Sequence, residues 1–256
     1  MNRAAVGTLA WELRTGGRLD RLDRVRLLAS ALQARLARRL RALGRPAYAR
    51  EARRVASIDI DGLRIPDTRA AREALAACHE ASPDFLVNHC LRTYLFGVLL
   101  ARGLRYDEEL FYAASLLHDL GLTAATSRHD ADTGCFAVAG ARQAHDLSVR
   151  WDWSNPRRDR LREAITLHLN VTVPPRQGAE AHLLHAGAAA DVVGARFREI
   201  PSDHVGAVLA AHPRAGFKEG LRERMRIEAR LRPDGRTAFL ARHGFFAMIE
   251  RAPFAD

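Results

Sequence analysis

Apolar residues recur at intervals of three and four along most of this chain, and this period limits the structures that it can form. Such spacing places side chains on one face of an α-helix, whereas a half-buried strand needs strict alternation. No stretch of appreciable length alternates in that way. We therefore predict an all-α fold. The plainest apolar stripe lies near the start and consists of Leu22, Val25, Leu28, Leu32, Leu36 and Leu40.

Further helices are predicted where the same period lies between residues that begin and end helices. Asp67 or Thr68 can cap a helix that begins near Ala70, and Ser82-Pro83-Asp84 begins the next. Gly44 and Pro46 end the first long helix. The remaining predicted helices span residues 107–118, 136–150, 155–168, 180–198, 204–211, 219–231 and 237–249.

Positive charge is concentrated in the first 55 residues. They contain 14 arginines and four acidic residues, whereas the other 26 basic and 26 acidic residues of the chain balance. We interpret residues 1–55 as an arginine-rich helical extension of a domain that spans 56–256. Two interpretations stay open: the apolar stripe packs on that domain while the arginines face water, or the extension binds an anionic partner, nucleic acid or a lipid surface.

The chain shows no sign of a membrane or secretory protein. No uncharged apolar run reaches the ~20 residues that span a bilayer, and no signal peptide is recognisable. Cys78, Cys90 and Cys135 form no CxxC pair, so we expect reduced thiols. These features predict a cytoplasmic protein, and self-association as a homo-oligomer stays open.

A histidine and an aspartate, His118 and Asp119, are adjacent where an apolar helix is expected to end at Gly121. Neighbours within a helix point about 100° apart, but at its end the backbone can bend and turn both side chains to one ion. Glycine permits such an ending because it adopts left-handed conformations without steric cost. His89 lies earlier, on an apolar face, and Asp191 lies later. Imidazole nitrogens and carboxylate oxygens suit zinc, iron and manganese.

With this set of residues, the chain resembles the HD-domain superfamily of metal-dependent hydrolases over about residues 60–250. Local segments are similar to the branch that contains cyanamide hydratases; they are residues 64–68, 88–97, 136–141, 164–168, 184–194 and 213–218. The resemblance implies an HD-domain helical bundle with residues 56–256 as the HD domain. It also implies that His89, His118, Asp119 and Asp191 bind a divalent metal ion, which is zinc, iron or manganese.

The same resemblance implies the chemistry. A bound divalent metal lowers the pKa of its water from 15.7 to ~7, so that the water becomes a nucleophile at neutral pH. Asp119 and His168 are the expected catalytic residues, with His168 moving protons because imidazole titrates near neutral pH. His182 and His185 share a helix face and are candidates for a second metal site, although Asp191 does not lie well on that face.

Three functions remain open from the sequence. The first is a hydrolase or hydratase that acts on a small molecule, like the cyanamide hydratases. The second is a phosphohydrolase for a nucleotide or another phosphoester, which needs cations such as Arg92 or Arg128 near the metal. The third is a non-catalytic protein that senses a ligand and binds nucleic acid or a membrane through residues 1–55. The intact ligand set favours an enzyme, and we expect a metal-dependent hydrolase or hydro-lyase that acts on a small molecule.

Overall fold

The computed structural model describes residues 3–43, 65–123 and 133–255, which are mostly helical. No strand occurs in these three ranges, so the predicted all-α class is confirmed. The α-helices in chain order are α1 (Leu9–Thr15), α2 (Arg21–Leu43), α4 (Arg69–Ala81), α5 (Asp84–Leu100), α6 (Glu108–Leu117), α8 (Phe136–Ser148), α9 (Asn155–Leu167), α10 (Ala179–Val193), α11 (Ser202–Ala211), α12 (Phe217–Leu231), α13 (Arg236–Arg242) and α14 (Phe245–Glu250). Short 3-10 helices are η1 (Leu120–Leu122), η2 (Val149–Trp151), η3 (Pro175–Gln177) and η4 (Phe197–Glu199).

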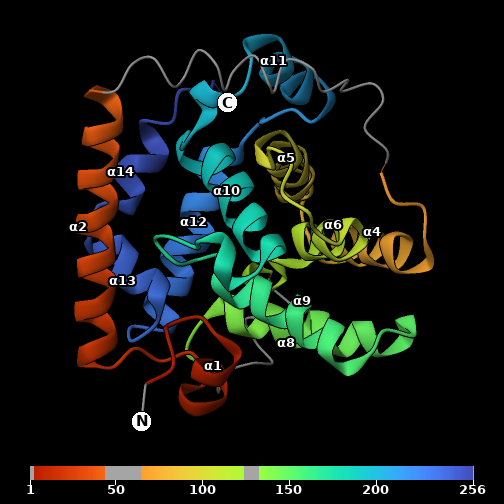
Figure 1. Ribbon diagram of the computed structural model, residues 1–256, viewed down its shortest axis with the longest axis horizontal. Helices are drawn as coiled ribbons and strands as arrows, with labels where there is room; N and C mark the ends of the chain where they lie inside the picture. The colour runs from red at the N-terminus through yellow and green to blue at the C-terminus, as the bar shows by residue number, and fades with distance from the viewer. Residues whose placement is uncertain (1–2, 44–64, 124–132, 256) are drawn as a thin grey trace.

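Helices α5 and α10 cross in the middle of the bundle, where they make its most extensive helix pair (Figure 1). Two glycines allow their close approach. A Cβ atom added to Gly187 of α10 would lie 2.0 Å from the carbonyl oxygen of Thr93 in α5, and one added to Gly97 of α5 would lie 3.0 Å from the carbonyl oxygen of Leu183 in α10. Because backbones approach this closely only where a side chain is missing, the glycines fix the crossing. The crossing in turn sets the position of His89 and Asp191 on the two helices.

Gly121 serves a close approach, not a left-handed turn, so the reason that the sequence suggested for it was wrong. It lies in η1 and is not among the glycines with positive φ. A Cβ atom there would lie 1.9 Å from the carbonyl oxygen of Phe136 in α8. The His-Asp pair is nevertheless at a helix end, because α6 stops at Leu117 and η1 begins after Asp119.

The N-terminal segment is tied into the bundle by buried polar groups. Trp11 of α1 is fully buried, and its Nε1 donates to Oδ2 of Asp23 over 3.0 Å. Glu12 is also fully buried and accepts from Nε of Arg142 at 3.2 Å and from Arg162. A buried carboxylate is tolerated only when it is paired in this way. Helix α1 is therefore joined to α8 and α9 by ion pairs as well as by its tryptophan.

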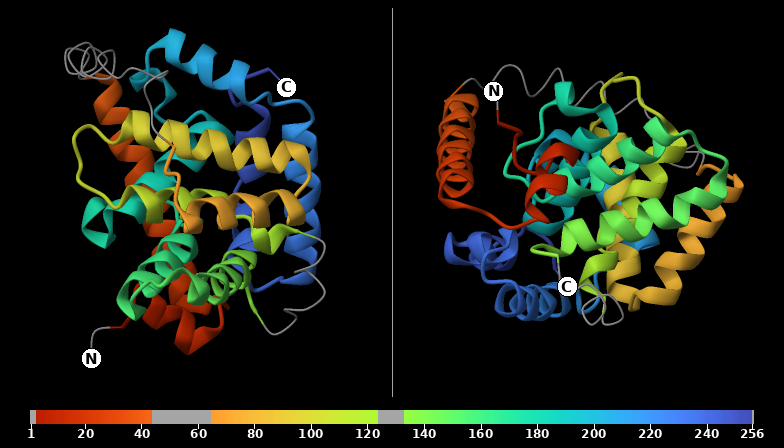
Figure 2. Two further views of the ribbon diagram at one scale, coloured as in Figure 1. Left: turned by 90° about the vertical axis from the view of Figure 1, so that its right-hand side faces the viewer. Right: turned by 90° about the horizontal axis from the view of Figure 1, so that it is seen from below.

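The apolar stripe of α2 faces solvent, so the interpretation in which it packs on the domain was wrong. The exposed side chains are Leu22, Val25, Leu28, Leu32 and Leu36, with exposed fractions from 44% to 69%. Leu27 and Asp23, on the opposite side of the helix, face the bundle and are buried. Figures 1 and 2 show α2 standing at the edge of the molecule. A contiguous exposed apolar face of this kind marks an interaction surface more often than chance.

Two of the predicted helices were too long, for one physical reason. Helix α10 ends at Val193 because Gly194 is left-handed, with φ of 67°, and Gly244, with φ of 89°, separates α13 from α14. Arg128 lies outside the described residues, as does the segment 44–64 with Gly44 and Pro46. Within the described ranges, no helix combines the length and apolar character that crossing a bilayer requires.

Candidate metal centre

Two histidines and an aspartate meet in a buried corner between the middle of α5 and the end of α6. Nε2 of His89 lies 3.2 Å from Nε2 of His118 and 3.5 Å from Oδ2 of Asp119. Nε2 of His118 is 3.4 Å from the same oxygen, and the three ligand atoms all lie within 4.8 Å of one another. The structure thus brings together three of the four side chains that the sequence suggested as ligands.

Local helix signals place the His-Asp pair. Asp107 caps the start of α6 by accepting from the backbone nitrogen of Leu110 over 3.0 Å, and the apolar helix then runs to Leu117. His118 still has helical torsion angles, but Asp119 leaves the helix with φ of −103° and ψ of 8°. This bend turns the two neighbouring side chains toward one point, as the sequence argument required.

Hydrogen bonds fix the tautomer of three histidines at this corner. Each has Nδ1 between 2.5 and 2.8 Å from an oxygen that can only accept, so each Nδ1 carries the hydrogen and each Nε2 keeps its lone pair. The acceptors are Oδ2 of Asp191 for His89, the carbonyl oxygen of Ser115 for His118 and that of Ile165 for His168. Two lone pairs and a carboxylate that face one another away from water fit a divalent cation.

Burial keeps the imidazoles of His118 and His168 neutral. Burial lowers the pKa of His118, although the charge of Asp119 partly opposes that shift. Burial, and then the neighbouring His118, lower the pKa of His168 well below its usual range. A neutral ring is the form that binds a metal or accepts a proton. The corner is therefore prepared for both tasks at neutral pH.

His168, the predicted proton carrier, lies directly beside the corner at the end of α9. Its Nε2 is 3.8 Å from Oδ1 of Asp119. Its ring stands edge-on to that of His118, with centroids 4.8 Å apart, and is 7% exposed. The structure therefore groups His168 with the metal-binding side chains, and its catalytic role stays a prediction.

Asp191 lies behind His89, at the Nδ1 side of the ring, and is not one of the three groups that converge. Its Oδ2 accepts from His89 at 2.7 Å, and Arg92 donates to both carboxylate oxygens, at 2.8 and 2.9 Å. Arg214 donates to Oδ1 at 2.5 Å. Burial alone would raise the pKa of Asp191, but the His89 bond and the Arg92 charge hold it below its usual range. Its assignment as a fourth metal ligand stays a prediction.

Arg92 and Arg214 are structural partners of Asp191. Arg92 is fully buried and also donates to the carbonyl oxygens of His212 and Pro213, at 3.0 and 2.9 Å. The sequence left open whether Arg92 binds substrate or pairs within the fold, and the geometry favours pairing. Sequence reasoning missed Arg214, because no local pattern connects it to α10. Its only signal was its place in the segment 213–218 that carried the family resemblance.

His182 and His185 do not build a second metal site in the described part of the chain. Nδ1 of His182 is hydrogen-bonded to the carbonyl oxygen of Val173 at 2.6 Å, and Nδ1 of His185 to that of His168 at 3.0 Å. Among the described residues, only the group of His89, His118 and Asp119 gathers three ligands. The two histidines instead lie on the wall of a separate cavity.

The fold and this corner define an all-α protein with a buried site that can hold a divalent metal. The model of the HD domain family matches residues 86–228, more than half of the chain, and the chain belongs to that family. HD domains are generally metal-dependent hydrolases. Comparison with the curated proteins found no match. The resemblance to the HD superfamily is confirmed, and the cyanamide hydratase-like branch remains a prediction.

Proposed function

We propose that this protein is a metal-dependent hydrolase or hydratase that acts on a small uncharged molecule, in the manner of the cyanamide hydratases. The observation that carries the proposal is the enclosure of the corner. His89 and His118 are each 1% exposed and Asp119 is 4% exposed. A substrate that reaches so buried a set of groups has to be small, and enclosure strengthens the electrostatic effect of every group inside.

The charges around the corner favour an uncharged substrate over a phosphoester. A phosphate needs cationic donors beside the metal. The two arginines behind His89, Arg92 and Arg214, already donate to the carboxylate of Asp191. If either arginine bound a phosphate instead, the fully buried carboxylate of Asp191 would lose one of its partners, which is costly. The phosphohydrolase alternative is therefore the less favoured one.

Each side chain has a distinct role in this proposal. His89, His118 and Asp119 would hold the ion, which, when bound, supplies a water molecule activated for attack at neutral pH. His168 has its Nδ1 engaged by the carbonyl oxygen of Ile165, so its Nε2, near Asp119, accepts a proton and later returns it. Phe217 stacks on His89, with ring centroids 4.9 Å apart, and keeps that ring in place.

The proposal is tested by assaying the metal-loaded protein against two sets of substrates: cyanamide and small nitriles, and nucleotide phosphates and p-nitrophenyl phosphate. We expect turnover with the first set only, and a loss of about 10²-fold or more in kcat for His168→Ala with metal content unchanged. Turnover of phosphoesters alone would replace this proposal by the phosphohydrolase function. No turnover of either set by metal-loaded protein would favour a non-catalytic sensor.

The exposed apolar face of α2 supports a second role, contact with an anionic membrane surface. Helix α2 contains seven arginines and one acidic residue, Asp23, whose buried carboxylate is bonded to Trp11. An anionic bilayer binds both kinds of side chain at once, because leucines insert into its apolar layer while arginines contact its anionic head groups. A nucleic acid would leave the leucines in water, and pairing with a second copy would bring like charges together. The lipid surface is thus the partner that fits both properties of the helix.

Vesicle sedimentation tests the membrane role. We expect binding to vesicles that contain phosphatidylserine and little binding to phosphatidylcholine alone. The double variant Leu32→Gln with Leu36→Gln should abolish it. Leu13→Gln, which also removes a largely exposed leucine, should bind as the wild type does. Retained binding by the double variant, or an α2-dependent dimer or nucleic-acid complex in place of vesicle binding, would contradict this role.

A further inference from the structure

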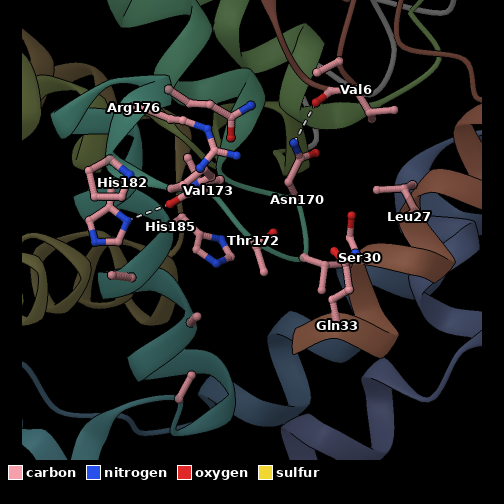
Figure 3. A pocket seen from close by; sticks show the side chains of 18 of the residues that line it. Val6, Leu27, Ser30, Gln33, Asn170, Thr172, Val173, Arg176, His182 and His185 are labelled. Carbon is pink, nitrogen blue, oxygen red and sulfur yellow. Dashed lines mark hydrogen bonds between the residues drawn. The ribbon is translucent and has the colours of Figure 1, made fainter. Parts of the chain in front are cut away.

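A large cavity lies apart from the metal centre, between α2 and α10, with a volume of about 1180 Å³ (Figure 3). Its walls are the inner side of α2, the start of the chain, the segment 170–177 after α9, and α10. Ser30 and Gln33 extend from α2, and His182 and His185 line the facing wall. None of the side chains at the metal corner lines it. The cavity is therefore separate from the metal corner.

The charged side chains that line this cavity are mostly arginines. Five of them line it against a single acidic residue, Glu199; the arginines are Arg3, Arg26, Arg102, Arg176 and Arg196. Glu199 accepts from both Arg102 and Arg196, the latter with Nε at 3.0 Å. Arg26 and Arg176 have no acidic partner among the described residues. Arg3 pairs with Asp20 and Asp23, which do not line the cavity. The positive charge that no described side chain offsets is therefore that of Arg26 and Arg176.

The remaining polar groups of the cavity add hydrogen-bonding capacity without adding charge. His182 and His185 are used at Nδ1 by backbone carbonyl oxygens, and burial lowers the pKa of both rings, so they are neutral at neutral pH. Their Nε2 atoms then accept hydrogen bonds. Ser30, Gln33 and Thr172 supply further donors and acceptors. Such a mixture suits an organic anion with several polar groups, rather than a bare inorganic ion.

We propose that this cavity binds a phosphate-bearing small molecule of nucleotide size. The planar guanidinium group binds phosphate oxygens through two parallel hydrogen bonds, and several arginines together favour a multiply charged phosphate over a single carboxylate. The volume exceeds the roughly 300–1,000 Å³ of ordinary small-molecule sites, so it holds a phosphate together with an attached ring or sugar. Arg26 and Arg176 hold the phosphate, and the neutral polar side chains contact the remainder of the ligand.

Calorimetric titration of the full chain with ATP, pyrophosphate and inorganic phosphate, in chelator to remove metal, tests the proposal. We expect ATP to bind more tightly than phosphate alone. The double variant Arg26→Gln with Arg176→Gln should weaken ATP binding by about tenfold or more. Arg35→Gln, an exposed arginine elsewhere on α2, removes charge without changing the cavity and should bind as the wild type does.

A second variant separates this cavity from the metal centre. Asp119→Ala should keep its affinity for ATP while it loses the bound metal. The proposal is overturned if the wild type binds none of the three compounds at about millimolar concentration, or if the double variant binds as well as Arg35→Gln. It is also overturned if Asp119→Ala abolishes binding, because the phosphate would then be at the metal corner.

Discussion

Asp191 accepts a hydrogen bond from Nδ1 of His89 over 2.7 Å, and both side chains are buried. Because Nδ1 is held in this way, Nε2 on the other side of the ring is directed at the corner that it shares with His118 and Asp119. The same carboxylate pairs with Arg92 and so joins α5 to α10. One aspartate thus links the position of a metal-binding histidine to the main helix crossing of the fold.

Removing that carboxylate should destabilise the fold strongly. Asp191→Ala leaves the buried guanidinium groups of Arg92 and Arg214 without their acidic partner, so we expect a loss of about 3–5 kcal/mol in the free energy of unfolding. Asp234 offers the matched control, because it also pairs with an arginine, Arg24, but its own side chain is 65% exposed. Asp234→Ala should cost less than about 1 kcal/mol. Urea denaturation measures both, and equal losses would contradict the buried-pair argument.

The N-terminal helix should contribute to the stability of the bundle. Glu12→Ala removes a fully buried carboxylate and leaves Arg142 and Arg162 without it, so we expect a loss of about 3 kcal/mol. Its neighbour Leu13 is 68% exposed, and Leu13→Ala should stay within about 0.5 kcal/mol of the wild type. Thermal unfolding compares the two variants. A neutral Glu12→Ala would contradict the view that α1 stabilises the bundle through its buried ion pairs.

The close crossing of α5 and α10 should not tolerate a methyl group. Gly187→Ala places Cβ against the carbonyl oxygen of Thr93, which cannot move without shifting α5, so we expect a loss of about 3 kcal/mol or more. Gly206 in α11 is the control, because nothing lies within 4 Å of its Cβ position. Gly206→Ala should stabilise by about 1 kcal/mol through helix propensity. Denaturation midpoints that move in the same direction for both would refute the packing argument.

Metal-free protein should lose stability as the pH falls. Burial lowers the pKa of five histidines below the ordinary value of 6.5; they are His118, His168, His182, His185 and His212. Below pH 6.5 the unfolded chain therefore binds protons that the folded chain excludes. Stability is complete above that pH and falls below it, by at most about 1.4 kcal/mol per histidine for each further drop of about one in pH. Urea denaturation in chelator at pH of about 7.5 and 5.5 measures the effect. His185→Gln should reduce the difference, and stability that rises at acid pH would contradict the assignment.

The sequence predicted what depends on neighbours along the chain. Thr68 caps α4, one of the two caps that the sequence suggested, and the His-Asp pair falls at a helix end. These features rest on short-range hydrogen bonds and on the helical period, both of which are visible in a sequence.

What the sequence could not predict depends on contacts between distant elements. The side of α2 that faces the bundle is chosen by Trp11 and Asp23, so its leucines face solvent although their spacing suggests a buried stripe. The pairing of Arg214 with Asp191, and the need of Gly121 for close packing on α8, likewise follow from tertiary contacts alone. Helical periodicity identifies an apolar face but not what covers it.

The central claim is that His89, His118 and Asp119 hold one divalent ion. Elemental analysis of the wild type and of His89→Ala, His118→Ala and Asp119→Ala, all purified without added metal, tests it most directly, with His79→Ala as a control outside the corner. We predict about one zinc, iron or manganese ion per chain in the wild type and the control, and loss of most of it in the three variants while their helical circular dichroism is kept. Full metal content in the three variants, or no bound metal in the wild type even after reconstitution, would contradict the account.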